Sequence, residues 1–177
     1  MTYVIIIHPF NTIKFNIFQC VLISKNNIYY LEMFEYDRSN FPLVKVKLIG
    51  TLDNENEFNQ FLNEWLTLYE DQNDFTFLFD TLEVGNPPLK YCIKMAQFIK
   101  QLRKKEYQYL QESIILINSN KIKWMLEFIF AIAPPVARVY IYNVNDDLNI
   151  YRDNVDDIKK SPNTVIVEAG DPLLPIF

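Results

Sequence analysis

The feature that most constrains the fold is a regular alternation of apolar strands and amphipathic helices between residues 43 and 142. LVKVKLIG (Leu43 to Gly50) alternates apolar and charged residues, which is typical of a strand with one wet face. NENEFNQFLNEWLTLY follows it, with apolar residues at helical spacing. FTFLF and SIILIN are apolar enough for strands that are covered on both faces. This rhythm predicts parallel strands joined by helices that pack against the sheet.

Proline marks the limits of two further helices. One is predicted to begin after Pro87-Pro88, which a first helical turn tolerates. The other is predicted from Lys121 to Ala133 and ends before Pro134-Pro135. VARVYIY and TVIVEA are predicted as the last two strands.

Two apolar stretches ahead of this pattern flank the short sequence SKN and predict an antiparallel hairpin. A hairpin in front of parallel strands makes the sheet mixed. We therefore expect an α/β fold with a mixed, largely parallel central sheet. At 177 residues the chain is expected to form a single domain, residues 1–177, with an apolar tail at residues 170–177.

Composition excludes several classes of function. The net charge of -5 and the pI of about 4.9 argue against nucleic acid and anionic membranes, because both require basic patches. No apolar run is long enough to span a bilayer, and the first residues lack the basic region of a signal peptide. Two cysteines without a metal or disulfide pattern predict a cytoplasmic protein. The excess of Lys over Arg, with many Asn and Ile, is typical of AT-rich genomes such as those of some parasites, slime moulds or large DNA viruses.

Residues 43–142 contain a strand ending in LIGTL, an amphipathic helix, a strand ending in the acid of FLFD, a loop and helix, and the strand IILIN. This succession resembles the STAS domain, the fold of anti-sigma-factor antagonists and of the cytoplasmic ends of sulfate transporters. The resemblance implies a loop after the acid with a phosphorylatable Ser at the start of the next helix. DTLEVGNPPLKYC departs from that pattern, since Thr81 is the only hydroxyl before the helix and prolines occupy the helix start. The CRAL-TRIO lipid-transfer fold shares the helix–strand rhythm and is the second candidate.

Candidate catalytic residues are few. Asp80 and Glu83 are predicted at a strand end, where they either carry acid–base chemistry or orient the loop backbone. His8 is the only histidine, so no pair of histidines can bind a metal. The three glycines do not form a known phosphate-binding loop. We expect no catalytic residue, no cofactor and no metal.

The third predicted helix carries more apolar surface than one sheet can cover. Trp124, Phe128 and Ile132 are candidate interaction residues on it. The tail GDPLLPIF adds four more: Leu173, Leu174, Ile176 and Phe177. The prolines keep the tail extended, and it packs either on its own domain or on a neighbouring subunit or protein.

The leading hypothesis is a non-enzymatic STAS-like domain that acts by protein–protein contact and self-associates through the aromatic helix and the tail. It predicts an oligomer that Phe177→Ala or Trp124→Ala weakens. The second hypothesis is a CRAL-TRIO-like carrier whose third helix lines a pocket for a lipid or another apolar ligand. The third is an enzyme that uses Asp80 and Glu83 in a cleft.

Overall fold

The computed structural model describes residues 21–24, 27–30, 33–51, 54–85, 87–145 and 154–170. Its main sheet has six strands in the order β3-β4-β5-β6-β7-β8, which is also their order along the chain. They are β3 (Phe34–Asn40), β4 (Leu43–Gly50), β5 (Phe75–Val84), β6 (Leu110–Ile117), β7 (Arg138–Asn143) and β8 (Thr164–Val167). Strands β4 to β7 run parallel to one another, and the edge strands β3 and β8 pair antiparallel with β4 and β7.

The predicted α/β class with a mixed, largely parallel sheet is confirmed. The N-terminal antiparallel pair of this sheet is β3–β4. The predicted hairpin around SKN also forms, from β1 (Val21–Ser24) and β2 (Asn27–Tyr30), but as a separate two-stranded sheet. The main sheet is therefore mixed because of its edge strands.

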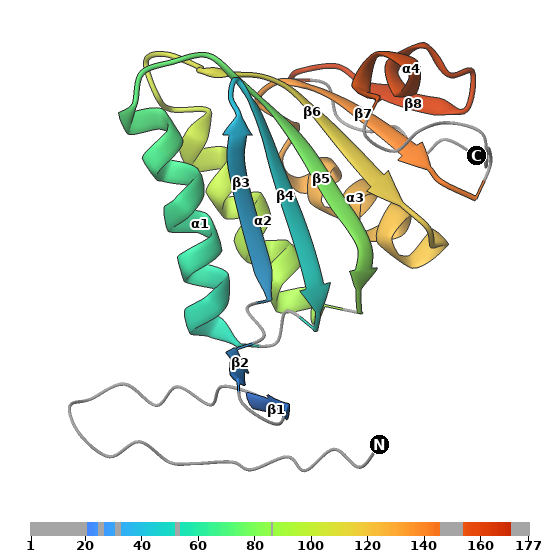
Figure 1. Cartoon of the computed structure of the whole chain (residues 1–177). Helices are drawn as coiled ribbons and strands as arrows, with labels where there is room; N and C mark the ends of the chain where they lie inside the picture. Colours follow the sequence, from blue (N-terminus) through green and yellow to red (C-terminus); the bar gives the residue numbers. More distant parts are fainter. Residues whose placement is uncertain are drawn as a thin grey trace.

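Three helices cover one face of the sheet: α1 (Glu55–Glu70), α2 (Leu89–Leu102) and α3 (Asn120–Ile132) (Figure 1). Each connects two adjacent parallel strands. Such crossovers are right-handed in nearly all proteins. Because successive strands are added in one direction, all three helices fall on the same face.

A fourth helix, α4 (Val155–Lys160), packs on the opposite face. Its Ile158 is fully buried against apolar residues of β5, β6 and β7. Lys159 also pairs with Glu112 of β6. This helix is absent from the sequence-based prediction, because VDDIKK is too short to show helical periodicity.

Local signals explain where the helices begin. Asn54 precedes α1, and its side chain accepts a hydrogen bond from the Asn56 amide at 2.9 Å. Ser119 caps α3 by accepting from the Ile122 amide at 3.3 Å. Both caps satisfy amides that the first helical turn leaves unpaired. Helix α2 begins directly after Pro88, as predicted.

The core between the helices and the sheet is dominated by aromatic rings. Trp65 of α1 makes an edge-to-face contact with Phe77 at 4.8 Å between ring centroids and another with Phe98 at 5.4 Å. Phe77 and Phe79 of β5 also contact each other at 4.7 Å. Pairs of this kind stabilise a core by about 0.5–1.5 kcal/mol beyond their buried area. Strand β5 and helix α1 thus form its centre.

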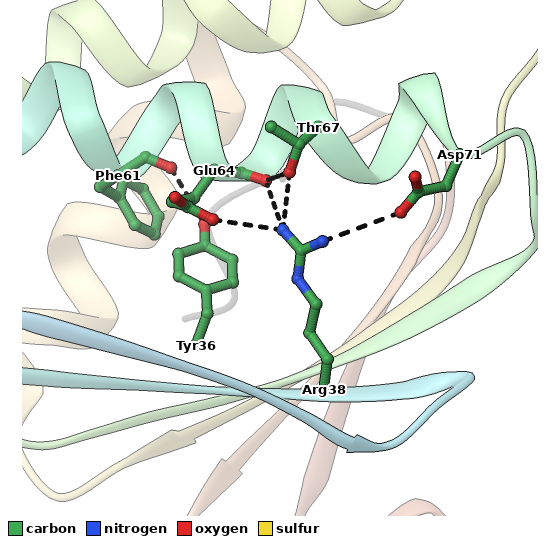
Figure 2. Close-up of polar contacts among 6 residues, drawn as sticks. All are labelled: Tyr36, Arg38, Phe61, Glu64, Thr67 and Asp71. Carbon is green, nitrogen blue, oxygen red and sulfur yellow. Dashed lines mark hydrogen bonds and ion pairs between the residues drawn. The ribbon is translucent and has the colours of Figure 1, made fainter.

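Polar contacts attach the edge strand β3 to α1 (Figure 2). The Tyr36 hydroxyl donates to the Phe61 carbonyl at 3.0 Å. The Arg38 guanidinium donates to the Thr67 hydroxyl at 2.6 Å and pairs with Glu64 at 3.2 Å. It also reaches Asp71 at 3.7 Å. Side chains therefore hold β3 to the first crossover helix, in addition to its backbone pairing with β4.

Tyr36→Phe is predicted to lower the free energy of unfolding by about 1 kcal/mol at pH 7, because it removes a partly buried hydrogen bond. Burial raises the pKa of Tyr36 well above its usual value of about 10. The unfolded chain then ionises at a lower pH than the folded one, so this contribution is lost as pH rises above about 10. Urea unfolding at pH 7 and pH 11 should show a smaller alkaline loss of stability in Tyr36→Phe.

The matched control is Tyr107→Phe, at a tyrosine that is exposed to solvent. It should leave the free energy of unfolding at pH 7 unchanged. Equal effects of the two substitutions would contradict the role assigned to the Tyr36 hydroxyl.

Candidate functional site

Asp80 and Glu83 lie within β5, toward its end, because the strand runs to Val84 and extends beyond the end that the sequence predicts at FLFD. Strand β5 continues beyond Phe79 because its pairing with β4 extends to Gly50 and Val84, whereas its pairing with β6 ends at Asp80. The predicted strand end was inferred from the last residue of the apolar run. A register shift between β4 and β5 accommodates the additional residues.

Both carboxylates have structural partners. The Asp80 side chain accepts a hydrogen bond from the Leu82 amide at 2.9 Å. Glu83 forms an ion pair with Lys47 of β4 at 2.7 Å, and this hydrogen bond raises the pKa of Lys47. Asp80 therefore orients the backbone near the end of its strand, which is the second of the two roles that the sequence left open.

Asp80 lines a hollow of about 200 Å³ on the face of the sheet that is opposite to helices α1, α2 and α3. Charged side chains of β3 and β4 line it together with two apolar residues of β5 and β6: Glu35, Asp37, Lys45, Lys47, Leu78 and Leu116. Charges of both signs alternate across this surface. Among the described residues, no group of three or more His, Cys, Asp or Glu side chains could hold a metal ion.

Two other residues with reactive side-chain atoms face the core. Thr81 is buried, and its hydroxyl donates to the Leu116 carbonyl at 2.6 Å. Burial also raises the pKa of the Cys92 thiol, which disfavours the nucleophilic thiolate. His8 and Cys20 lie outside the described residues. Neither Thr81 nor Cys92 is presented to a solvent-borne substrate.

An apolar cavity of about 150 Å³ lies between the helices and the sheet. Residues of α2 and α3 form much of its wall: Cys92, Met95, Ile122, Met125, Leu126 and Ile129. Trp65 also lines it, is only 7% exposed, and has an indole N–H without an acceptor in the described part of the chain. The third helix does contribute to the wall of an apolar space, as the carrier hypothesis requires.

The outer side of α2 and α3 bears exposed apolar residues. Trp124 is 56% exposed and stacks on Phe128 at 5.6 Å between ring centroids. Leu89 and Ile93 of α2 are 48% and 41% exposed. We call these four residues the α2–α3 surface. Ile132, the third helical candidate, is partly buried against the core.

Helical geometry places the four residues on adjoining sides of two helices in contact. Tyr91 and Phe98 mark the side of α2 that faces α1, through ring contacts with Phe58 and Trp65. Leu89 and Ile93 project from the opposite side, toward α3, because residues four apart share one face. Trp124 and Phe128, four residues apart, likewise share one face of α3. The α2–α3 surface therefore consists of residues from two helices that pack against each other.

The tail residues Leu173, Leu174, Ile176 and Phe177 lie outside the described residues. The described chain ends at Gly170, whose amide donates to the Pro135 carbonyl at 3.0 Å.

No protein-family model, curated protein or solved structure matches the chain.

Sequence reasoning found Trp124 and Phe128 from the excess of apolar residues on α3. It missed Leu89 and Ile93 as exposed residues, although their spacing of one helical turn was a usable signal. The cavity had no sequence signal, since its walls come from strands and helices distant along the chain.

Asp80→Ala is predicted to lower the free energy of unfolding by about 1 kcal/mol, because the Leu82 amide loses its acceptor. Asp80→Asn keeps an oxygen at the same place and should remain close to the original stability. Urea unfolding of both variants tests this. An Asn variant as unstable as the Ala variant would contradict the backbone-orienting role.

Proposed function

We propose that this chain is a non-enzymatic α/β domain that acts by protein–protein contact and self-associates through the α2–α3 surface. The observation that carries the proposal is the exposed Trp124, stacked on the partly buried Phe128, together with exposed Leu89 and Ile93 on the neighbouring helix. Aromatic residues of this kind are enriched at the centres of protein interfaces. A second copy of the chain supplies an identical apolar surface, as a twofold dimer requires.

The surroundings of the candidate catalytic residues support a role without chemistry. Asp80 accepts a hydrogen bond from a backbone amide, and Glu83 forms an ion pair with Lys47. The Thr81 hydroxyl is buried and donates a hydrogen bond to a backbone carbonyl. The last contact also supports the absence of the phospho-switch that a STAS domain would place near this position.

STAS-like ancestry and a cytoplasmic location stand as our proposals from the sequence. Among the described residues, no helix is long and apolar enough to cross a membrane.

Trp124→Ala is predicted to weaken the dimer by about 2 kcal/mol, or roughly 30-fold in dissociation constant, if Trp124 occupies the centre of the interface. Native mass spectrometry and sedimentation velocity over a concentration series measure this. The matched control is Ile166→Ala, which removes an equally exposed apolar side chain from β8. The proposal fails if both variants associate like the original chain.

The cavity favours a second candidate function, the binding of a small apolar ligand. A volume of about 150 Å³ is close to that of an engineered cavity that binds benzene. It is smaller than the roughly 300–1,000 Å³ of pockets for drug-sized ligands. The candidate ligand is therefore a compact apolar group rather than a whole lipid, and a CRAL-TRIO-like carrier would need a wider opening.

Benzene is predicted to raise the thermal unfolding midpoint, because a ligand that binds only the folded state stabilises it. Cys92→Leu, which places a larger side chain at the cavity wall, should abolish this rise. Cys92→Ala enlarges the cavity and should preserve it. Differential scanning calorimetry with and without benzene tests all three chains, and an equal rise in every chain would contradict binding in this cavity.

A further inference from the structure

The apolar tail leaves the described structure beside the C-terminal ends of α2 and α3. Gly170 donates its amide to the Pro135 carbonyl, directly after α3. Arg103, which caps α2, donates to the Pro134 carbonyl at 3.1 Å. A Cβ added to Gly170 would lie 3.8 Å from Nη2 of Arg103. Residue 171 therefore starts at one end of the two helices that carry the α2–α3 surface.

The length of the tail matches the length of this surface. Helix α3 has 13 residues and is therefore about 20 Å long. Residues 171–177, when extended, reach up to about 25 Å. A tail that runs back along α2 and α3 from Gly170 brings Phe177 to the turn that contains Trp124, near the start of α3.

The composition of the tail suits an extended segment on an apolar surface. Pro172 and Pro175 prevent a regular helix and reduce the conformational freedom that docking must remove. Leu173, Leu174, Ile176 and Phe177 provide apolar side chains along its length. The α2–α3 surface offers Leu89, Ile93, Trp124 and Phe128 as their counterparts.

We propose that residues 171–177 dock on the α2–α3 surface of their own chain and compete there with a second copy. The proposal rests on the proposed function, since both need this surface to hold apolar protein groups. Attachment at Gly170 makes docking intramolecular, which gives the tail an effective concentration on the order of millimolar. A second copy must displace the tail before it can bind.

The sequence-based hypothesis treats the helix surface and the tail as parts of one interface. In the present proposal they have opposite effects on self-association. Trp124→Ala damages the surface and weakens self-association, as above. Removal of residues 171–177 uncovers the surface and strengthens self-association, and Phe177→Ala acts in the same direction. If the tail instead joined two copies, both changes to the tail would weaken self-association. The sign of the effect therefore distinguishes docking in cis from docking in trans.

The decisive experiment places the photo-cross-linker p-benzoylphenylalanine at position 177 of the full chain. Equal amounts of ¹⁴N-labelled and ¹⁵N-labelled chains are mixed, irradiated at low concentration, and analysed by mass spectrometry of the cross-linked peptides. We expect cross-links from position 177 to residues 89–93 or 121–128, with both peptides carrying the same label. A chain with the cross-linker at Phe41, an exposed residue between β3 and β4, is the matched control.

Each outcome decides the proposal. Cross-links within one label to these residues, together with a lower dimer dissociation constant in the chain without residues 171–177, support it. Cross-links between the two labels show that the tail docks in trans and overturn it. Cross-links to other parts of the chain, or an unchanged dissociation constant after truncation, also overturn it. Loss of self-association in Trp124→Ala with cross-links elsewhere would leave the proposed function intact while the tail proposal fails.

Discussion

The structure depends on one constraint, the sequential addition of parallel strands from β4 to β7. Each new strand pairs with the preceding one, so each crossover helix must return on the same side of the sheet. The aromatic side chains of β5 and α1 fill the space that this creates. The opposite face receives only α4 among the described helices. The division of the molecule into a thick apolar layer and a partly charged sheet face follows from the strand order.

The same constraint locates the candidate sites. Open α/β sheets commonly bind ligands where the strand order reverses, because two crossovers then diverge. From β4 to β7 the order does not reverse, so this type of crevice is not formed there. The helices lie side by side instead, with a cavity beneath them and the α2–α3 surface outside. The proposed function rests on this outer surface rather than on a strand end.

Much of the fold was predictable because its signals are local. The apolar spacing of α1, the prolines before α2 and after α3, and the apolar strands β5 and β6 each predict an element from a few neighbouring residues. The failures have equally specific causes. The end of β5 depends on how far β4 pairs with it, and α4 depends on burial of Ile158 against distant strands. Neither pairing nor burial can be read from adjacent residues.

The same distinction between local and long-range information applies to the candidate site. The sequence by itself determined that α3 carries excess apolar residues, that residues 171–177 are mostly apolar and include two prolines, and that known phosphate-binding loops and histidine pairs are missing. Only the tertiary structure decided that Leu89, Ile93 and Trp124 are exposed on two helices that pack together, and that Gly170 lies beside the ends of both helices. The reason is physical: side-chain type and spacing are properties of a short segment, whereas which surfaces meet is set by strand pairing and helix packing across the whole chain.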